Sequence, residues 1–215
     1  MNIDQEILNI LESLHFPDNG KYVGNGGSSP VTLEYFEYCM EKVHRDGIYD
    51  KESLWLEFGV WNGNTLCELA SFAPSIVYGF DSFEGLPEDW VKSDIDTMGK
   101  GFFDEGGRIP SKLKKHKGIE LVVGWFNETL PNFIKTHKNP CSLIHVDCDL
   151  YSSTKTVLDT LIGSGQIIPG TIIMFDELIG YTNFQEHEIK ALMESGLTYK
   201  YIAHTKMQAA IQVIE

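Results

Sequence analysis

The strongest constraint on the fold is a series of short apolar runs that alternate with segments able to form helices. The runs have strand length and cover Leu54–Val60, Ile76–Phe80, Ile119–Val123, Ser142–Val146 and Thr171–Phe175. Strands that are nearly continuous in apolar residues are buried on both faces, which is typical of a parallel sheet with helices on either side. The pattern therefore predicts an α/β domain with five parallel strands.

The last two apolar runs follow a different rule. Thr198–His204 and Gln208–Ile214 are separated only by Thr-Lys-Met, which is too short for the crossover that parallel strands need. They should pair as an antiparallel hairpin. The predicted fold is a Rossmann-like doubly wound sheet of five parallel strands plus a C-terminal antiparallel hairpin.

Residues 1–53 precede the first strand and are predicted to form a helical extension to a domain that spans residues 54–215. Apolar residues recur at helical spacing in 3–14 and again from Thr32 to about Arg45. The Gly/Ser/Pro/Asn-rich segment 17–30 between them is either a lid that closes over a cofactor or a mobile linker.

A second loop-rich segment, 91–117, separates the second and third strands. Its charged and glycine-rich pieces lie on the side where a substrate would enter, and insertions of this length are usually functional or disordered.

The composition is that of an ordinary globular protein, with 42% hydrophobic and 22% charged residues in a chain of 215. No apolar run is long enough to span a bilayer, and the first residues lack the basic and apolar regions of a secretory signal. The four cysteines form no CxxC pair and suit a reducing compartment. We therefore expect a soluble, cytoplasmic protein.

Acidic residues outnumber basic residues by 31 to 17, which gives a formal net charge of −14. A chain this acidic repels phosphate backbones and anionic membranes unless it carries a local basic patch. The only basic cluster, Lys112–Lys117, is short and typical of a solvated helix end. We therefore expect a small-molecule substrate and no nucleic-acid or membrane partner. The sequence leaves open whether the chain forms a homo-oligomer.

A loop with two glycines follows the first predicted strand. Gly59 and Gly63 allow a tight turn and a close approach of the backbone to a ligand, and Asn64 or Thr65 can cap the next helix. The GxxxG spacing differs from the GxGxxG of pyrophosphate-binding turns. S-adenosylmethionine carries an amino acid and a sulfonium instead, and Glu57 could accept a hydrogen bond from its ammonium group, directly or through water. A plain strand-to-helix turn is the alternative.

Asp81 ends the second predicted strand, about 20 residues beyond the loop, where an acid can hold both ribose hydroxyls of an adenosine. Its alternative role is to cap the turn that begins at Ser82. Loop, spacing and strand context favour the adenosine interpretation, so Asp81 and Ser82 are candidate cofactor-binding residues. Trp125, at the end of the third strand, could wall the adenine or belong to the core.

Acidic residues gather where the fourth and fifth strands end, with Asp147 and Asp149 after one and Asp176 and Glu177 after the other. Parallel strands end at one edge of the sheet, and neighbouring carboxylates are costly unless a positive charge neutralises them. Mg²⁺ is the natural candidate for a set of oxygen ligands. The alternative is that these acids are solvated caps, and Asp149 in particular is expected to cap the helix that opens at Tyr151.

Several motifs resemble the class I S-adenosylmethionine-dependent methyltransferases, namely LEFGVWNGNTL, YGFDSFEGLPEDW, GWFNETLP, HVDCDLYSST and GTIIMFDE. Within that class they are most similar to the branch of macrocin and mycinamicin sugar O-methyltransferases. The resemblance runs from Leu54 to the C-terminus and implies S-adenosylmethionine as the cofactor. It assigns the cofactor-binding acids to Glu57 and Asp81 and the loop glycines to Gly59 and Gly63.

The resemblance also implies Mg²⁺ beside the acceptor hydroxyl, with Asp147, Asp176 and Glu177 at the ligand positions; Glu177 stands where a second Asp is expected. A hydroxyl bound to Mg²⁺ is more acidic, and a nearby carboxylate can accept its proton. Asp147 is the candidate for both tasks. His145, two positions earlier on the same face of the strand, is either the base instead or a packed structural histidine.

These observations predict a methyltransferase that acts on a hydroxyl of a sugar or sugar-bearing metabolite. A nucleotide-dependent oxidoreductase is disfavoured by the missing GxGxxG and by the terminal hairpin. A non-catalytic S-adenosylmethionine-binding domain would not need the acidic cluster. The sequence does not name the acceptor or separate O- from N-methylation.

Overall fold

The computed structural model describes residues 30–48 and 50–215. The helix predicted for 3–14 and nearly all of the 17–30 segment lie outside the described residues.

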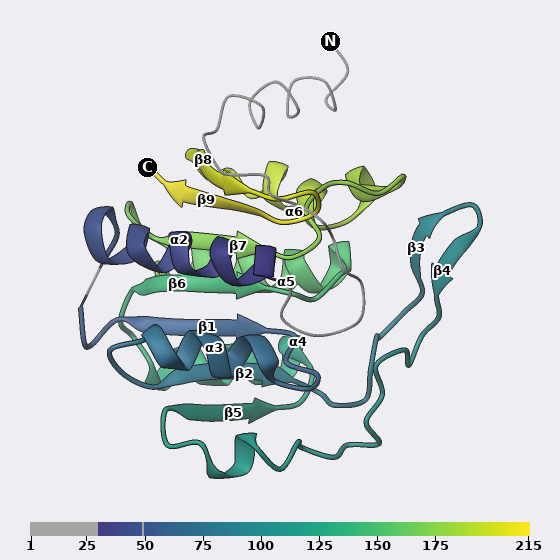
Figure 1. Cartoon of the computed structure of the whole chain (residues 1–215), viewed down its shortest axis with the longest axis horizontal. Helices are drawn as coiled ribbons and strands as arrows, with labels where there is room; N and C mark the ends of the chain where they lie inside the picture. The colour runs from purple at the N-terminus through teal and green to yellow at the C-terminus, as the bar shows by residue number, and fades with distance from the viewer. Residues whose placement is uncertain (1–29, 49) are drawn as a thin grey trace.

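A seven-stranded sheet forms the centre of the molecule, in the order β5-β2-β1-β6-β7-β9-β8 (Figure 1). The parallel strands are β1 (Leu54–Phe58), β2 (Val77–Asp81), β5 (Ile119–Val123), β6 (Cys141–Val146) and β7 (Ile172–Phe175). The terminal hairpin consists of β8 (Tyr199–His204) and β9 (Ala209–Val213). β9 pairs antiparallel with both β7 and β8. The predicted five parallel strands and antiparallel hairpin are confirmed, and the hairpin is joined to the same sheet.

Helices cover both faces of this sheet. They are α2 (Pro30–Asp46), α3 (Asn64–Phe72), α4 (Phe126–Thr136), α5 (Tyr151–Gly163) and α6 (Glu188–Met193), with short 3-10 turns η1 (Leu113–Lys115) and η2 (Phe184–Glu186). α2 and α3 lie on one face, and α4, α5 and α6 pack on the other. Among the described residues, no helix combines the length and apolar character needed to cross a membrane.

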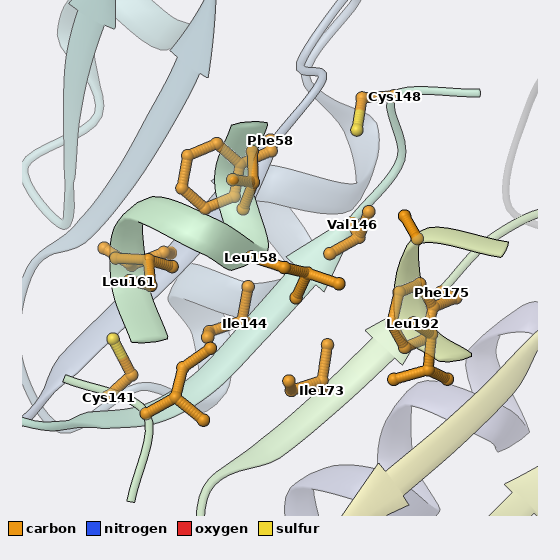
Figure 2. Packing of buried hydrophobic residues seen from close by; sticks show 14 of the residues in the cluster. Phe58, Cys141, Ile144, Val146, Cys148, Leu158, Leu161, Ile173, Phe175 and Leu192 are labelled. Atoms are coloured by element: carbon orange, nitrogen blue, oxygen red, sulfur yellow. The ribbon is translucent and has the colours of Figure 1, made fainter. Parts of the chain in front are cut away.

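Alternate residues of the central strands face the α4–α6 layer. Phe58, Val146 and Phe175 lie at the carboxyl ends of β1, β6 and β7 and belong to one buried cluster. Figure 2 shows this cluster, with Leu158 of α5 and Leu192 of α6 lying over the strands. Full burial of each such side chain stabilises the fold by about 1.5–3 kcal/mol. The continuous apolar runs are therefore explained by a sheet that is buried on both sides.

The intervening strand residues face the α2–α3 layer. Phe36 and Met40 of α2 are buried in the same cluster as Trp55 of β1 and Met174 of β7. α2 is thus part of the core that supports the sheet. Its face of the sheet also carries His145, so it covers the strand that leads to the acidic residues.

The 91–117 insertion carries a feature that the sequence pattern did not predict, an antiparallel hairpin of β3 (Trp90–Ser93) and β4 (Asp96–Met98). The hairpin projects beyond the edge of the main sheet where the parallel strands end (Figure 1). Trp90 anchors it, because this side chain is 1% exposed and packs with Leu86 and Leu150. The insertion is therefore attached to the body of the protein next to the segment that follows β6.

Candidate active site

The segments after β1, β2, β6 and β7 meet at the carboxyl edge of the sheet, and backbone hydrogen bonds join them. The N–H of Gly59 donates to the carbonyl of Phe80 at 3.0 Å, and that of Asp147 donates to the carbonyl of Phe58 at 2.8 Å. The N–H of Asp176 donates to the carbonyl of Val146 at 3.0 Å. These bonds extend the strand pairing into the loops, so the backbone that carries the candidate site residues is held by the sheet.

The loop after β1 needs both of its glycines. Gly59 has a φ of +91°, and a Cβ atom there would lie 1.6 Å from the backbone oxygen of Asp147. Gly63 has a φ of +74°, and a Cβ atom there would lie 2.6 Å from Leu113 of the insertion. The loop is therefore packed against the Asp147 segment on one side and against the insertion on the other.

Asp81 holds this loop through its carboxylate. Oδ2 accepts the N–H groups of Val60 and Trp61, each at 2.7 Å, and Oδ1 accepts the N–H of Phe83 at 2.6 Å. The bond from Phe83 is the turn cap that the sequence left open as an alternative, and the bonds to the glycine loop add a contact that the sequence did not suggest. Ser82 is buried, and its Oγ accepts the N–H of Glu84 at 3.1 Å.

Glu57 lies beneath the loop with its side chain wholly buried. Thr65 Oγ1, in the first turn of α3, donates to Glu57 Oε1 at 2.9 Å, and His145 Nδ1 lies 3.4 Å from Glu57 Oε2. Burial raises the pKa of the Glu57 carboxyl, and His145 opposes that rise. The charge of Glu57 therefore depends on the two side chains that contact it.

His145 is completely buried on β6, between Glu57 and the ring of Phe36, whose centroid lies 5.0 Å away. Of the two roles that the sequence left open, this position favours the packed histidine, because a catalytic base must reach a substrate proton. Trp125 is half-buried at the N-cap of α4, directly after Gly124, whose N–H donates to the carbonyl of Asp81 at 2.9 Å. Trp125 is therefore held close to Asp81 by its neighbour Gly124. The contact of Trp125 with adenine stays a prediction.

Three carboxylates come together beside the glycine loop. Asp147, Asp149 and Glu177 each offer an oxygen, and these oxygens all lie within 4.8 Å of one another. Asp176 is not part of this group of three, and its Oδ1 accepts a hydrogen bond from Gln208 Nε2. The sequence had placed Asp176 in the group and Asp149 outside it, so the structure differs from that expectation in one member.

Asp149 does not cap α5 as expected, because its backbone adopts a left-handed conformation. α5 begins at Tyr151 with Leu150 as its N-cap and without a side-chain cap, whereas Asp149 was expected to cap this helix. Its φ is +62°, a conformation that costs a non-glycine residue about 1–3 kcal/mol and is common at functional sites. This turn leaves the Asp149 carboxylate beside Asp147 and Glu177 instead of over the helix end.

The charged forms of the three carboxyl groups are destabilised by their surroundings. Burial, followed by the charges of Asp176 and Asp149, raises the pKa of Asp147 well above its usual range, and burial with Asp176 raises that of Glu177 in the same way. Burial and Asp176 raise the pKa of Asp149 to about 7, with Lys92 of the hairpin opposing the rise. Negative charges held together in this way are stabilised by a cation.

A fourth acidic residue, Glu188, also lies at this cluster and was missed by the sequence reasoning. It is fully buried at the start of α6, and its Oε2 accepts the N–H of Glu177 at 3.4 Å. Its other oxygen, Oε1, and Glu177 Oε2 are buried and have no hydrogen-bond partner among the described residues. The available signal was an acid in a segment, EIKALM, whose apolar members are mostly buried.

Buried oxygens without partners, next to three convergent carboxylates, fit a hard divalent cation. Mg²⁺ prefers oxygen ligands, and among the described residues one oxygen of Glu177 and one of the adjacent Glu188 have no hydrogen-bond partner. The glycine loop and Asp81 are joined to this acidic group through the contact between Gly59 and Asp147. The site thus combines a strand-end loop for one ligand with an acidic centre for another.

The solved structures that resemble this fold include methyltransferases. The O-methyltransferase NovP is 17% identical with a TM-score of 0.64, and the match covers 85% of this chain and 79% of NovP. CalS11, a TDP-rhamnose 3′-O-methyltransferase of calicheamicin biosynthesis, is 20% identical with a TM-score of 0.55 over 97% of this chain and 92% of that one. The O-methyltransferase from Bacillus cereus, in complex with SAH, is 12% identical with a TM-score of 0.54 over 98% and 90%.

At the level of sequence, no curated protein matches the chain significantly. A family model does match, and it covers residues 30–194, which include α2, the glycine loop and all the acidic residues described above. The chain belongs to the macrocin-O-methyltransferase (TylF) family and is an S-adenosylmethionine-dependent methyltransferase.

Proposed function

We propose that this protein methylates a hydroxyl group of a small molecule, a sugar or a glycosylated metabolite, and that Mg²⁺ assists the reaction. The observation that carries the proposal is the group of three carboxylates, Asp147, Asp149 and Glu177, at the loop that is expected to hold the cofactor. A cofactor-binding loop alone would not need a buried acidic centre at its side.

S-adenosylmethionine supplies a methyl group that its sulfonium has already activated. The task of the chain is then to bind the cofactor and to align the acceptor oxygen. Glu57 would face the ammonium group, and Asp81 would hold the ribose hydroxyls while keeping the loop in place through the N–H groups of Val60 and Trp61. Gly59 and Gly63 keep the backbone of that loop free of side chains.

Asp147, Asp149 and Glu177 would hold Mg²⁺ through carboxylate oxygens. The bound cation would make the acceptor hydroxyl more acidic. Asp147 stands nearest the glycine loop, because its backbone contacts Gly59 and Phe58, and we assign it the task of accepting the hydroxyl proton. The same residue would therefore contact the metal and the acceptor.

The substrate class rests on the family and on charge. CalS11 acts on a TDP-rhamnose, and the family model is that of a macrocin O-methyltransferase, so sugar-bearing acceptors are the best supported class. The net charge of −14 disfavours nucleic acids as acceptors. The hairpin β3–β4 stands beside the acidic centre through Trp90 and Leu150, and it would border the entering acceptor.

Calorimetry tests the cofactor assignment. SAH should bind, and NAD should give no signal. Asp81→Ala should weaken SAH binding by about 1.5–3 kcal/mol, the range for a hydrogen bond to a charged group. Tight binding of NAD, or an Asp81→Ala variant that binds SAH normally, would contradict the assignment.

Methylation assays test the metal assignment. EDTA should stop the transfer of methyl groups to a sugar acceptor, and added Mg²⁺ should restore it. Asp147→Asn keeps the size of the side chain but removes its charge, so it should abolish most turnover while SAH binding stays largely intact. Full activity in EDTA would leave the fold and the cofactor in place and would remove the metal from the reaction.

A further inference from the structure

Among the residues that the structure describes, Glu188 is the one buried acid at this edge of the sheet to which neither the sequence motifs nor the proposed reaction gives a task. It is the first residue of α6, 11 residues beyond Glu177 in the chain, and its side chain is 0% exposed. No basic side chain of the described residues forms an ion pair with it. A carboxyl in such a place is costly unless it serves its neighbours.

The contacts of Glu188 join the two loops that carry the acidic centre. Its Oε2 accepts the N–H of Glu177 at 3.4 Å. The backbone of Cys148 also interacts with this carboxyl and lowers its pKa. Cys148 stands between Asp147 and Asp149, so one side chain contacts the backbone of both segments. Its other oxygen, Oε1, is buried without a partner among the described residues, as is Glu177 Oε2.

The charges around Glu188 also place it next to the acidic group. Burial, followed by the charges of Asp149 and Asp176, raises the pKa of Glu188 well above its usual range. Glu188 is therefore close enough to interact with the acidic group, although it is not one of the three residues whose oxygens converge. It contacts the backbone of Glu177, one of those three residues, and groups that hydrogen-bond to metal-ligating residues commonly orient them.

We propose that Glu188 is a positioning residue of the metal centre, which holds the β6 and β7 loops in register and adds its charge to their attraction for a divalent cation. The inference rests on the proposed metal-assisted function. It concerns binding of the metal alone, so its test does not depend on knowing the acceptor.

The test is a calorimetric titration of the intact protein with Mn²⁺, a substitute for Mg²⁺, in the absence of cofactor and acceptor. Glu188→Gln keeps an oxygen that can accept the N–H of Glu177 but removes the charge. The affinity for Mn²⁺ should fall by about tenfold or more, as for other outer partners of metal ligands. The matched control is Glu186→Gln, which removes the same charge at an exposed residue that pairs with Lys190, and should change the affinity by less than about twofold.

A thermal melt in EDTA separates this role from a merely structural one. Because metal-free carboxylates repel one another, Glu188→Gln should melt at or above the wild-type temperature while it binds Mn²⁺ more weakly. Should this variant fail to fold, Glu188→Asp keeps the charge but shortens the reach to the two loops, and the affinity should still fall at least about threefold.

The outcomes distinguish a failure of the metal assignment from a failure of the role proposed for Glu188. A wild-type protein that binds no Mn²⁺ overturns both the metal assignment and the role of Glu188. A wild-type protein that binds Mn²⁺, together with a folded Glu188→Gln variant of equal affinity, overturns the role of Glu188 alone.

Discussion

The carboxylate of Glu57 and the imidazole of His145 face each other at 3.4 Å in the interior of the protein, and neither side chain is exposed to solvent. The two residues are direct partners in the register of β1 and β6. Thr65 donates to the other oxygen of Glu57. Each oxygen of the acid beneath the cofactor loop therefore lies next to one of these two side chains.

This pairing predicts a selective defect in cofactor binding. His145→Leu leaves the buried Glu57 without its partner, so the carboxyl should become protonated and lose its attraction for the ammonium group of the cofactor. The affinity for SAH should fall by about tenfold, the effect of one hydrogen bond to a charged group. The affinity for 5′-methylthioadenosine, which lacks the amino acid, should stay within about twofold because Glu57 is not expected to contact adenosine.

Two further variants make this comparison specific. His145→Asn retains a side-chain N–H and should bind SAH better than His145→Leu. Ile144→Val alters the neighbouring buried residue, which faces the opposite layer, and should affect neither ligand. Equal losses for SAH and 5′-methylthioadenosine in His145→Leu would show that His145 only maintains packing.

The membership of the acidic group can be tested one residue at a time. Asp149→Asn and Glu177→Gln should each weaken Mn²⁺ binding strongly, because their oxygens converge with that of Asp147. Asp176→Asn removes an equal charge from a side chain that already accepts a hydrogen bond from Gln208, and its effect should be smaller. Calorimetry on the three variants measures this order, and a larger loss in Asp176→Asn would restore the membership expected from the sequence.

Gly59 should tolerate no side chain. Gly59→Ala places a Cβ atom 1.6 Å from the backbone oxygen of Asp147 at a φ of +91°, so the loop or the acidic segment must move. The free energy of unfolding should fall on the order of 2–4 kcal/mol, from steric overlap and backbone strain together. In urea denaturation the control is Gly163→Ala in α5, where a Cβ atom meets nothing within 4 Å and helix propensity improves. Equal stability of the two variants would contradict the close approach.

The metal-free protein should lose stability as the pH rises. Burial and Asp176 raise the pKa of Asp149 to about 7, whereas an unfolded Asp titrates near pH 4. Between these values the folded protein binds more protons than the unfolded chain, so the free energy of unfolding decreases with increasing pH. In EDTA the melting temperature should therefore be lower at pH 8 than at pH 5.

Asp149→Asn is the control for this pH dependence. It lacks the titrating group, so its melting temperature should change less between pH 5 and pH 8 than that of the wild type. An equal change in both proteins would assign the effect to other groups.

The main sheet could be predicted because its strands are apolar and separated by helical segments, and because Thr-Lys-Met is too short for a crossover. The β3–β4 hairpin could not. Of the residues in β3 only Trp90 is buried, and β4 has none, so neither strand shows an apolar pattern. It is held by residues that are remote in the sequence, because Trp90 packs against Leu150 and the β3 backbone bonds to Asn183 and His187.

The site residues that could be predicted from the sequence are those located at the ends of parallel strands. Glu57, Asp81 and Asp147 each lie at or just after the end of a parallel strand, and their spacing is visible in the sequence. The exchange of Asp176 for Asp149 depends on a left-handed backbone turn and on Gln208, a residue of the terminal hairpin. Neither feature leaves a local pattern that a reader of the sequence could recognise.

The position of β9 determines when the edge of β7 can be paired during translation. β9 separates β7 from β8 although it follows both of them in the sequence. While the chain is being translated, β7 must keep an open hydrogen-bonding edge until the residues through Val213 have left the ribosome. An apolar, unpaired strand edge is prone to associate with other chains. The newly synthesised protein should therefore depend on chaperones during this interval more than a protein whose edge strands are made last.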